Sequence, residues 1–289
     1  MTVNEQTKGQ TVIGVDMGGT KIRTGKVKDT QITATASDFV PKTDNEQEVT
    51  DVLVRLIREV YDQDVAGIGV GVPSLVDAGK GIVYNVQNIP AWKEVYLKDI
   101  LEKEFAVPAY VNNDANCFAT GERFFGKGRD YDDFVGLICG TGLGAGIIKG
   151  GHLMPDRNCG SGEFGEIPYL EGITEHYASG QFFERTYGVS GDEMARRAGE
   201  NDREALKAFD EFAVHLGKAI KTIMLAVDPA AIIMGGGVSE SWEFYRDALW
   251  KEIRNFPYPR SVENLEILVT DTQELALLGA AALYYNAAV

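Results

Sequence analysis

The chain has 289 residues, of which 44% are hydrophobic and 25% are charged. This composition is typical of a soluble globular protein, and the length suffices for two lobes with separate cores or for one large α/β unit. The formal net charge of −15 argues against binding to nucleic acid or to an anionic membrane surface. No apolar run reaches about 18 residues, and no basic segment precedes an apolar one at the N-terminus, so neither a membrane span nor a signal peptide is predicted. The three cysteines are an odd number and widely spaced, which predicts a reduced, cytoplasmic setting.

The first predicted elements are two strands joined by a tight turn. Residues 13–23 read IGVDMGGTKIR, an apolar run that ends in Asp16, turns on two glycines and leaves as a second strand. Glycines can take positive φ and let an anion approach the backbone N–H groups, and Asp16 could hold a magnesium ion beside that anion. An ordinary glycine hairpin is the alternative. The residues predicted to contact a phosphate are Gly18, Gly19, Thr20 and Lys21.

The same form occurs a second time, in residues 134–150, FVGLICGTGLGAGIIKG. A repeated hairpin implies two related halves. A third glycine cluster follows the apolar strand predicted at residues 231–234. Three glycine loops, each at the end of an apolar strand, favour contact with a nucleotide over ordinary turns. The residues predicted at the second and third loops are Gly140, Thr141, Gly142, Gly236 and Gly237.

Strands and helices alternate after the first hairpin. Residues 31–37 and 67–72 are predicted as strands, and apolar residues at helical spacing predict a helix over residues 46–62. Further helices are predicted over residues 94–105 and 117–125. This alternation predicts a partly parallel sheet, with ligands at the carboxyl ends of its strands.

Two polar segments in this region are candidates for substrate contact. Residues 84–92, YNVQNIPAW, carry amide side chains, among them Asn88, that suit a sugar, although such loops are often surface filler. Residues 109–116, AYVNNDAN, form a short strand that ends on polar side chains. A carboxylate at the end of a buried strand is desolvated unless it is used, so Asp114 is the predicted general base. A helix cap by an Asp or Asn of this run is the alternative, and both roles can occur in neighbouring residues.

A glycine-rich segment after the second hairpin contains Glu163, Glu166 and Glu175. Carboxylates can accept hydrogen bonds from the hydroxyls of a polyol. A solvated acidic surface is the alternative. The C-terminal third is more regular, with a long core helix over residues 205–227 that ends at an Asp-Pro pair. It continues with a strand at 231–234, a helix near 242–254, a strand at 265–270 and a final helix from Glu274, whose small residues suit close packing.

In this order, the motifs DMGGTKIR, GVPSLVD, NNDAN, GTGLGAGI, GEFGE, YASG, DPAAIIMGGGVS and LLGAAAL resemble those of the ROK family (repressor, open reading frame, kinase) of sugar kinases. The resemblance implies a two-lobed, actin-like α/β fold of the ribonuclease-H-like, hexokinase type. The lobes would comprise residues 1–115, with the C-terminal helix 275–289 packed on them, and residues 116–274. ATP and sugar would bind in the cleft between the lobes, and the reaction would be ATP-dependent phosphorylation of a hexose hydroxyl, the 6-hydroxyl by family expectation.

The resemblance also implies roles for single residues. Asp114 matches the catalytic aspartate and Asn113 the asparagine that holds the sugar, while Glu163 and Glu175 match sugar-binding glutamates. The predicted glycine loops match the nucleotide loops. Two departures matter: Glu166 stands where the family usually has histidine, and the cysteine-rich zinc loop is missing. We therefore expect ATP and Mg²⁺ but no zinc.

The resemblance leaves several questions open. Glucose or a related hexose is the first expectation for the substrate, with a β-glucoside, N-acetylhexosamine, fructose or allose as alternatives. Polyphosphate is an alternative donor. A homodimer is expected, since dimers are the commonest oligomers and are common in this family. A non-catalytic sugar sensor, a DNA-binding regulator and a kinase of the same superfold acting on acetate or glycerol are the alternatives from other classes.

Overall fold

The computed structural model describes residues 9–86 and 88–287 of the chain. The chain divides into two compact units, which we call unit 1 and unit 2. Unit 1 comprises Met1–Asp132, Gly146–Ser161 and Asp271–Val289, and unit 2 comprises Asp133–Ala145 and Gly162–Thr270. Gln87 of the predicted sugar loop and the last two residues of the predicted C-terminal helix lie outside the described residues. The predicted lobe boundary at residue 115 stays a prediction.

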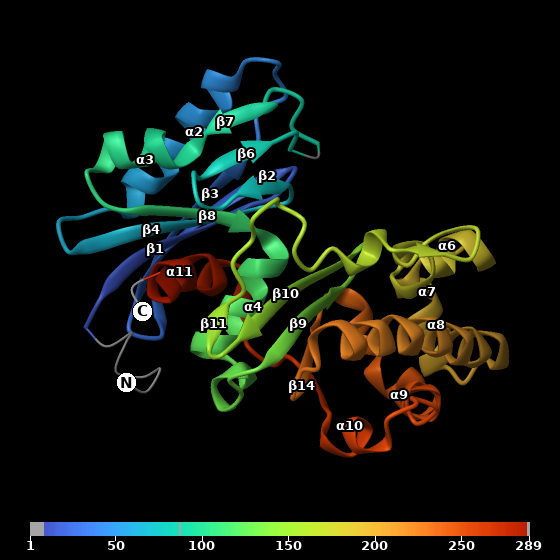
Figure 1. The fold of residues 1–289 in the computed structure, drawn as a ribbon. Coiled ribbons are helices and arrows are strands. Elements are labelled where there is room, and N and C mark those ends of the chain that lie inside the picture. Colours follow the sequence, from blue (N-terminus) through green and yellow to red (C-terminus); the bar gives the residue numbers. More distant parts are fainter. Residues whose placement is uncertain (1–8, 87, 288–289) are drawn as a thin grey trace. The chain divides into compact units, whose positions relative to one another are not determined.

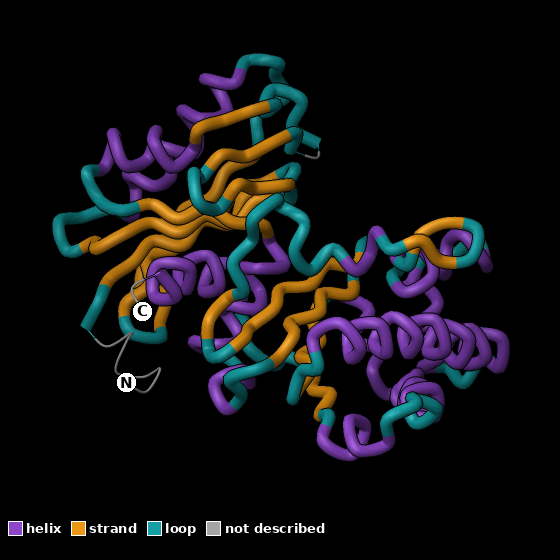
Figure 2. The backbone as a smooth tube through the Cα atoms, viewed as in Figure 1, coloured by secondary structure: helices purple, strands orange, loops and turns teal. Residues whose placement is uncertain are grey.

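Unit 1 is built on a five-stranded sheet (Figures 1 and 2). Strand β1 pairs antiparallel with β2, which pairs antiparallel with β3, and on its other side β1 pairs parallel with β4, which pairs parallel with β8. The first predicted hairpin is therefore present, and it opens a mixed sheet as expected. In spatial order the strands are β3 (Gln31–Phe39), β2 (Lys21–Lys28), β1 (Thr11–Met17), β4 (Val65–Val72) and β8 (Ala109–Asn113).

Helices cover both faces of this sheet because successive side chains of a strand point to opposite faces. Ile13, Val15 and Met17 of β1 join the core formed with α2 (Glu46–Val60) and α3 (Leu97–Phe105). Val12 joins the core on the other face, with α4 (Asp114–Phe125) and α11 (Leu275–Ala287). Figure 1 shows α2 and α3 on one side of the sheet and α11 on the other.

Two glycines let α11 lie directly on the sheet backbone. A Cβ atom at Gly14 of β1 would lie 2.1 Å from the carbonyl oxygen of Leu277, and one at Gly69 of β4 would lie 1.8 Å from that of Ala280. The small residues of the final helix thus serve close packing, as the sequence suggested, and this packing lies inside unit 1.

A second five-stranded sheet has the same plan as the first. Its central strand β9 neighbours its hairpin partner β10 and then β11 on one side, and the parallel strands β14 and β15 on the other. Both sheets thus consist of three sequential strands followed by two parallel ones, which is the internal repeat predicted from the two hairpins. The strands in spatial order are β11 (His152–Leu153), β10 (Leu143–Lys149), β9 (Phe134–Cys139), β14 (Ala231–Gly235) and β15 (Glu266–Val269).

The helical core of unit 2 centres on α8 (Arg203–Val227), which ends at Asp228 in a left-handed conformation before Pro229. One apolar face of this helix is buried, and Phe209 and Phe212 on it pack against Phe183 and Tyr245. The remaining helices of unit 2 are α5 (Glu175–Ala178), α6 (Gln181–Tyr187), α7 (Gly191–Gly199), α9 (Trp242–Ile253) and α10 (Pro259–Asn264). Short 3₁₀ helices are η1 (Lys127–Asp130) in unit 1, and η2 (Phe164–Glu166) and η3 (Gly237–Ser241) in unit 2.

Two small sheets were not predicted. Strands β5 (Leu75–Asp77), β6 (Ile82–Tyr84) and β7 (Glu94–Tyr96) form one of them, so the helix predicted over residues 94–105 starts only at Leu97. The predicted start was wrong because Glu94 and Tyr96 pair with β6. The other is the hairpin of β12 (Pro168–Tyr169) and β13 (Gly172–Ile173). None of the described helices is long and apolar enough to cross a membrane.

Candidate active site

In unit 1 the glycine turn between β1 and β2 is closed by backbone hydrogen bonds. The Gly18 amide donates to the Lys21 carbonyl at 2.9 Å, and the Val40 amide donates to the Thr20 carbonyl at 2.9 Å. Neither Gly18 nor Gly19 has a positive φ. The positive φ that the sequence suggested for them is therefore wrong, and what these glycines contribute is the absence of a side chain at the turn.

The carboxyl ends of three neighbouring strands bring polar residues to one edge of the first sheet. Asp16 of β1 is paired with Gly71 of β4, and Gly71 is paired with Asn112 of β8. Asp114 follows as the first residue of α4. The parallel pairing therefore sets Asp16 and Asp114 at the same edge, two strands apart, which is where the alternation of elements predicted a ligand site.

The start of α4 is capped by Asn113, not by Asp114. The Asn113 side chain accepts a hydrogen bond from the Asn116 amide at 2.7 Å, and the buried side chains of Asn112 and Asn116 are joined at 2.8 Å. Asp114 accepts from the Ala115 amide at 2.9 Å. The cap and the candidate base are thus neighbouring residues. The side-chain oxygen of Asn113 serves the cap, and its side-chain NH₂ group can donate to a sugar hydroxyl.

Desolvation by the surrounding protein perturbs the titration of this edge. It raises the pKa of Asp114, although this side chain is open to solvent, and the hydrogen bond from the Ala115 amide opposes the effect. Burial also raises the pKa of Asp16; Arg23 opposes this, and the charges of Asp114 and Glu274 add to it. The pKa of the buried Cys117 thiol is raised well above its ordinary value, first by burial and then by both aspartates. A carboxylate with a raised pKa is a better proton acceptor, which suits general base chemistry.

Arg23 of β2 is a cation at this edge of the sheet. It lies opposite Asp16 across the hairpin and is ion-paired with Glu274.

Asn88 lies in an exposed turn after β6, with a left-handed φ of 66°. Its predicted sugar contact stays a prediction.

In unit 2 the second and third glycine loops lie against each other. A Cβ atom at Gly236, which has a φ of 85°, would lie 2.4 Å from the carbonyl oxygen of Cys139. Only glycine fits there, because both the conformation and the space exclude a side chain. The Gly140 amide donates to the Gly142 carbonyl at 3.0 Å, which closes the turn between β9 and β10.

The predicted carboxylates of unit 2 lie on elements that pack on the start of β10. Cβ atoms at Gly162 and Gly165, which flank Glu163, would lie 2.0 and 2.5 Å from the carbonyl oxygens of Ala145 and Leu143. Glu166 is exposed at the end of η2. Glu175, the first residue of α5, accepts a hydrogen bond from the Leu143 amide at 2.9 Å.

A short hairpin, β12 and β13, connects Glu166 to Glu175 and is held on α8 by aromatic side chains. The Tyr169 hydroxyl lies 2.9 Å from Nδ1 of His215, and both rings contact Tyr177. Burial lowers the pKa of His215, and the positive charge of Lys218 adds to this. The lowered pKa favours the neutral imidazole, whose Nδ1 can accept a hydrogen bond from the Tyr169 hydroxyl when the ring proton is on Nε2.

A pocket of about 220 Å³ opens beside the glycine loops of unit 2. The loops contribute Gly140, Thr141 and Gly237, and the ring of Phe209 lies at its wall. Helices α6 and α7, which were not predicted, contribute Gln181, Glu184 and Asp192, and Ser190, the N-cap of α7, lies beside them. Thr141 and Ser241 are the other polar residues that line this pocket. None of the described residues that line this pocket is basic.

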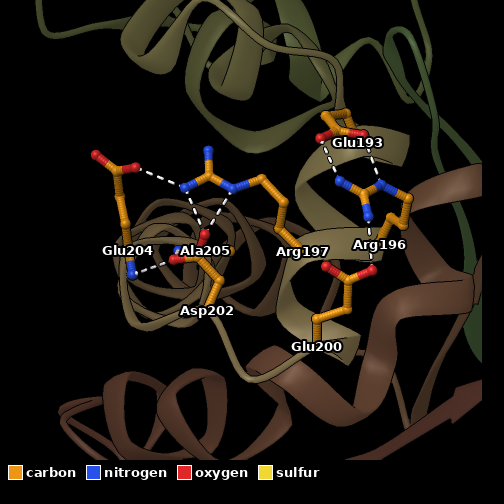
Figure 3. A network of polar contacts seen from close by, with 7 residues as sticks. All are labelled: Glu193, Arg196, Arg197, Glu200, Asp202, Glu204 and Ala205. Atoms are coloured by element: carbon orange, nitrogen blue, oxygen red, sulfur yellow. Dashed lines mark hydrogen bonds and ion pairs between the residues drawn. The ribbon is translucent and has the colours of Figure 1, made fainter.

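Ion pairs anchor α7, whose first turn lines the pocket, to α8 (Figure 3). Arg197 of α7 donates to Asp202 and to Glu204 at 2.7 Å each, and Asp202 caps the N-terminus of α8. Ser190 caps α7 by accepting from the Glu193 amide at 3.2 Å. The sequence Ser-Gly-Asp-Glu at residues 190–193 is a capping-box pattern, and it is the signal that would have predicted α7.

Among the described residues, no group of three or more His, Cys, Asp or Glu side chains is arranged to hold a metal ion. A magnesium ion that binds together with a nucleotide keeps several waters and needs only one or two carboxylates beside the phosphates. Asp16 is a carboxylate that could take this part.

Comparison with known proteins identifies this arrangement. Residues 12–287 match the ROK family. The chain belongs to the ROK family. It is 28% identical to a glucokinase of Thermotoga maritima, over 94% of this chain and 96% of that protein, and 31% identical to an N-acetyl-D-glucosamine kinase of Vibrio parahaemolyticus, over 81% and 86%. Among solved structures, a ROK family glucokinase from Streptomyces griseus in complex with glucose and AMPPNP has a TM-score of 0.76 and 30% identity, over 94% of this chain and 98% of that one.

These matches confirm the predicted family and the actin-like ATPase fold. Unit 1 of this protein carries the first glycine turn, Asp16 and Asp114. Unit 2 carries the other two glycine loops and the glutamates Glu163, Glu166 and Glu175. The residues that sequence reasoning missed are the polar side chains of α6 and α7 at the pocket. Gln181 stood directly after the recognised YASG motif but had no pattern of its own.

Proposed function

We propose that the chain is a hexose kinase, which transfers the γ-phosphoryl group of ATP to a hydroxyl of glucose or a related hexose, by family expectation the 6-hydroxyl. The observation that carries this proposal is the position of Asp114, a solvent-accessible carboxylate at the carboxyl end of β8 whose pKa is raised by desolvation against the surrounding protein. Its position needs no helix-capping explanation, since Asn113 caps α4. Similarity to sugar kinases over most of the chain supports it.

In the proposed reaction, Asp114 accepts the proton of the sugar hydroxyl. The hydroxyl oxygen bonds to the γ-phosphorus, the bond from that phosphorus to the β–γ bridging oxygen breaks, and ADP leaves. Amide groups of Asn113 and Asn88 and carboxylates of Glu163, Glu166 and Glu175 orient the sugar. A magnesium ion, when bound with ATP near Asp16, would neutralise phosphate charge.

The nucleotide is proposed to bind at the glycine loops, Gly18, Gly19, Thr20 and Lys21 in unit 1 and residues 140–142 with 236–237 in unit 2. Glu184 and Asp192 give the unit 2 pocket an acidic lining. Carboxylates accept hydrogen bonds from ribose hydroxyls and from an adenine amino group, but they repel a phosphate chain. This supports ATP over polyphosphate as the donor.

The decisive experiment is a coupled ADP-release assay with ATP and magnesium. The panel comprises glucose, mannose, fructose, allose, N-acetylglucosamine, N-acetylmannosamine and cellobiose, with acetate and glycerol as controls for the other kinases of this superfold. Turnover of one sugar far above the rest would name the substrate. The similarity to an N-acetyl-D-glucosamine kinase makes N-acetylhexosamines the second candidate. Sugar binding by calorimetry without turnover would mean a sensor and would refute the kinase.

Two further parts of the proposal concern partners. The charge of −15 supports a protein without a nucleic-acid partner, and a gel shift with duplex DNA would test this. We also propose a homodimer in a cytoplasmic setting, on the prior that symmetric dimers are the commonest oligomers. Light scattering at several concentrations would measure the mass.

A further inference from the structure

One short segment of unit 2, residues 175–181, holds the glycine loop at residues 140–143 through several hydrogen bonds. The Gly180 amide donates to the Gly140 carbonyl at 2.7 Å. The single proton of the Ser179 hydroxyl is shared between the Glu175 carbonyl at 2.7 Å and the Thr141 carbonyl at 3.1 Å. The Glu175 carboxylate accepts from the Leu143 amide at 2.9 Å. Backbone groups along the whole loop are thus fixed by one neighbouring segment.

Both oxygens of the Glu175 carboxylate have partners. Oε2 accepts from the Leu143 amide, and Oε1 accepts from the side-chain amide of Gln181 at 2.8 Å. The loop leaves room for this carboxylate only because residue 142 is glycine, since a Cβ atom there would lie 2.6 Å from Oε2. Hydrogen bonds to a carboxylate are stronger than those between neutral groups and fix its orientation.

Gln181 has a second environment, because its side chain also lines the pocket beside the loop. It therefore lies between the proposed nucleotide site and the carboxylate that holds the loop. Resting on the proposed function, we infer that Gln181 and Glu175 are positioning residues for the nucleotide: Gln181 orients the carboxylate, the carboxylate holds the Leu143 amide, and the loop amides thereby face the phosphates. This role of Glu175 is separate from its proposed contact with the sugar.

The sharpest perturbation is Gln181→Glu, which keeps the shape of the side chain but replaces the amide donor with a second carboxylate. At neutral pH the two carboxylates repel each other, and Glu175 loses one charge-assisted hydrogen bond. We expect the dissociation constant for AMPPNP with magnesium, measured by calorimetry without sugar, to rise about tenfold, the size of one lost hydrogen bond to a charged group. A value within about twofold of the wild type overturns the inference.

A titration of the same variant separates positioning from mere structural damage. A protonated carboxyl at residue 181 can donate to Glu175 again. The affinity of Gln181→Glu for AMPPNP should therefore recover as the pH falls from about 8 to about 5.5, relative to the wild type. If the dissociation constant of Gln181→Glu for AMPPNP stays raised by the same factor over this pH range, the inference is overturned.

A double-mutant cycle tests whether the two residues act together. Gln181→Leu and Glu175→Gln should each weaken AMPPNP binding, and the double variant should be no weaker than the worse single one. The matched control is Glu184→Gln, which lines the same pocket, and its effect should add to that of Glu175→Gln. Additive effects of Gln181→Leu and Glu175→Gln would mean that Gln181 acts only by direct contact, and would overturn the inference.

These measurements also separate this inference from the proposed function. A wild-type protein that binds no nucleotide refutes the proposed kinase. A wild-type protein that binds AMPPNP, with Gln181→Glu binding it equally well, leaves the kinase in place and refutes only the positioning role.

Discussion

Replacing Asp114 with asparagine tests the proposed base with little disturbance of the fold. Asp114 is the first residue of α4, and an asparagine oxygen can still accept from the Ala115 amide, as the carboxylate does at 2.9 Å. The helix cap on Asn113 is untouched. The substitution therefore removes the ability to take a proton and leaves the local hydrogen bonds in place.

The expected loss in turnover follows from the role. A positioned general base contributes about 10²–10⁴-fold to a rate, which is about 2.7–5.5 kcal/mol of activation free energy. We expect kcat of Asp114→Asn to fall by this amount while the dissociation constant for the sugar stays within a few fold. In the wild type, kcat/KM should rise with pH through a pKa above the ordinary aspartate value of 3.8, because burial raises the pKa of Asp114.

The stability of Asp114→Asn should not fall together with its activity. A raised pKa in the folded state means that Asp114 favours folding at pH values below its unfolded pKa, and that this contribution is lost as the pH rises through the folded-state pKa. Because the Asp114 side chain is open to solvent, which screens its charge, the cost of that charge at neutral pH is small, and asparagine removes it. Asp114→Asn should unfold at the same temperature as the wild type or at a higher one.

The assay is ADP release with the best sugar of the panel, beside sugar calorimetry and thermal unfolding. Asp99→Asn is the matched control, since Asp99 also lies in the first turn of a helix, α3, and is exposed. It should leave turnover unchanged. Near-normal turnover of Asp114→Asn would remove Asp114 from the base role, and a fall in turnover with lower thermal stability would show damage to the fold instead.

Three further substitutions test other parts of the structure. Gly69→Ala places a Cβ atom 1.8 Å from a carbonyl oxygen of α11, so it should lower the free energy of unfolding in urea by about 1–3 kcal/mol or more. The control is Gly199→Ala, where no atom lies within 4 Å of the new Cβ, and it should raise the free energy of unfolding by about 0.5–1 kcal/mol through helix propensity. Equal stabilities of the two variants would contradict the close packing. Glu166→His should change the ranking of sugars in the kinase panel, and an unchanged ranking would place Glu166 outside the sugar site. Tyr169→Phe removes the 2.9 Å hydrogen bond to His215 and should lower the free energy of unfolding by about 0.5–1.5 kcal/mol, so a variant as stable as the wild type would show that the ring contacts alone hold the hairpin.

The parts of the fold with strong periodic patterns were predicted well. The two hairpins, the parallel strands and the long α8 follow from apolar runs and helical stripes, because each buries one continuous face. The three-residue strands β5, β6 and β7 carry too few residues for a pattern, so Glu94 and Tyr96 were assigned to a helix. The short helices α5, α6 and α7 of unit 2 follow segments that contain glycine, where loop and helix start share the same residue types.

In the candidate site too, residues with a local sequence pattern were predicted and contacts without one were not. Asp16 and Asp114 were found because a charged residue at the end of an apolar run stands out in a sequence. The hydrogen bonds from Leu143 and Gln181 to Glu175 join residues on three different elements. No local sequence pattern predicts such a contact. The sequence therefore indicated Glu175 but not its hydrogen bonds with Leu143 and Gln181.

The place of α11 in unit 1 bears on how the protein is made in the cell. This helix packs on one face of the first sheet, where its carbonyl groups lie against Gly14 and Gly69, yet the ribosome translates it only after all of unit 2. Unit 2 ends at Thr270 and can complete its core while α11 is still being made. Unit 1 begins before unit 2 and is completed after it: until α11 emerges, its sheet exposes apolar surface that a nascent-chain chaperone could cover.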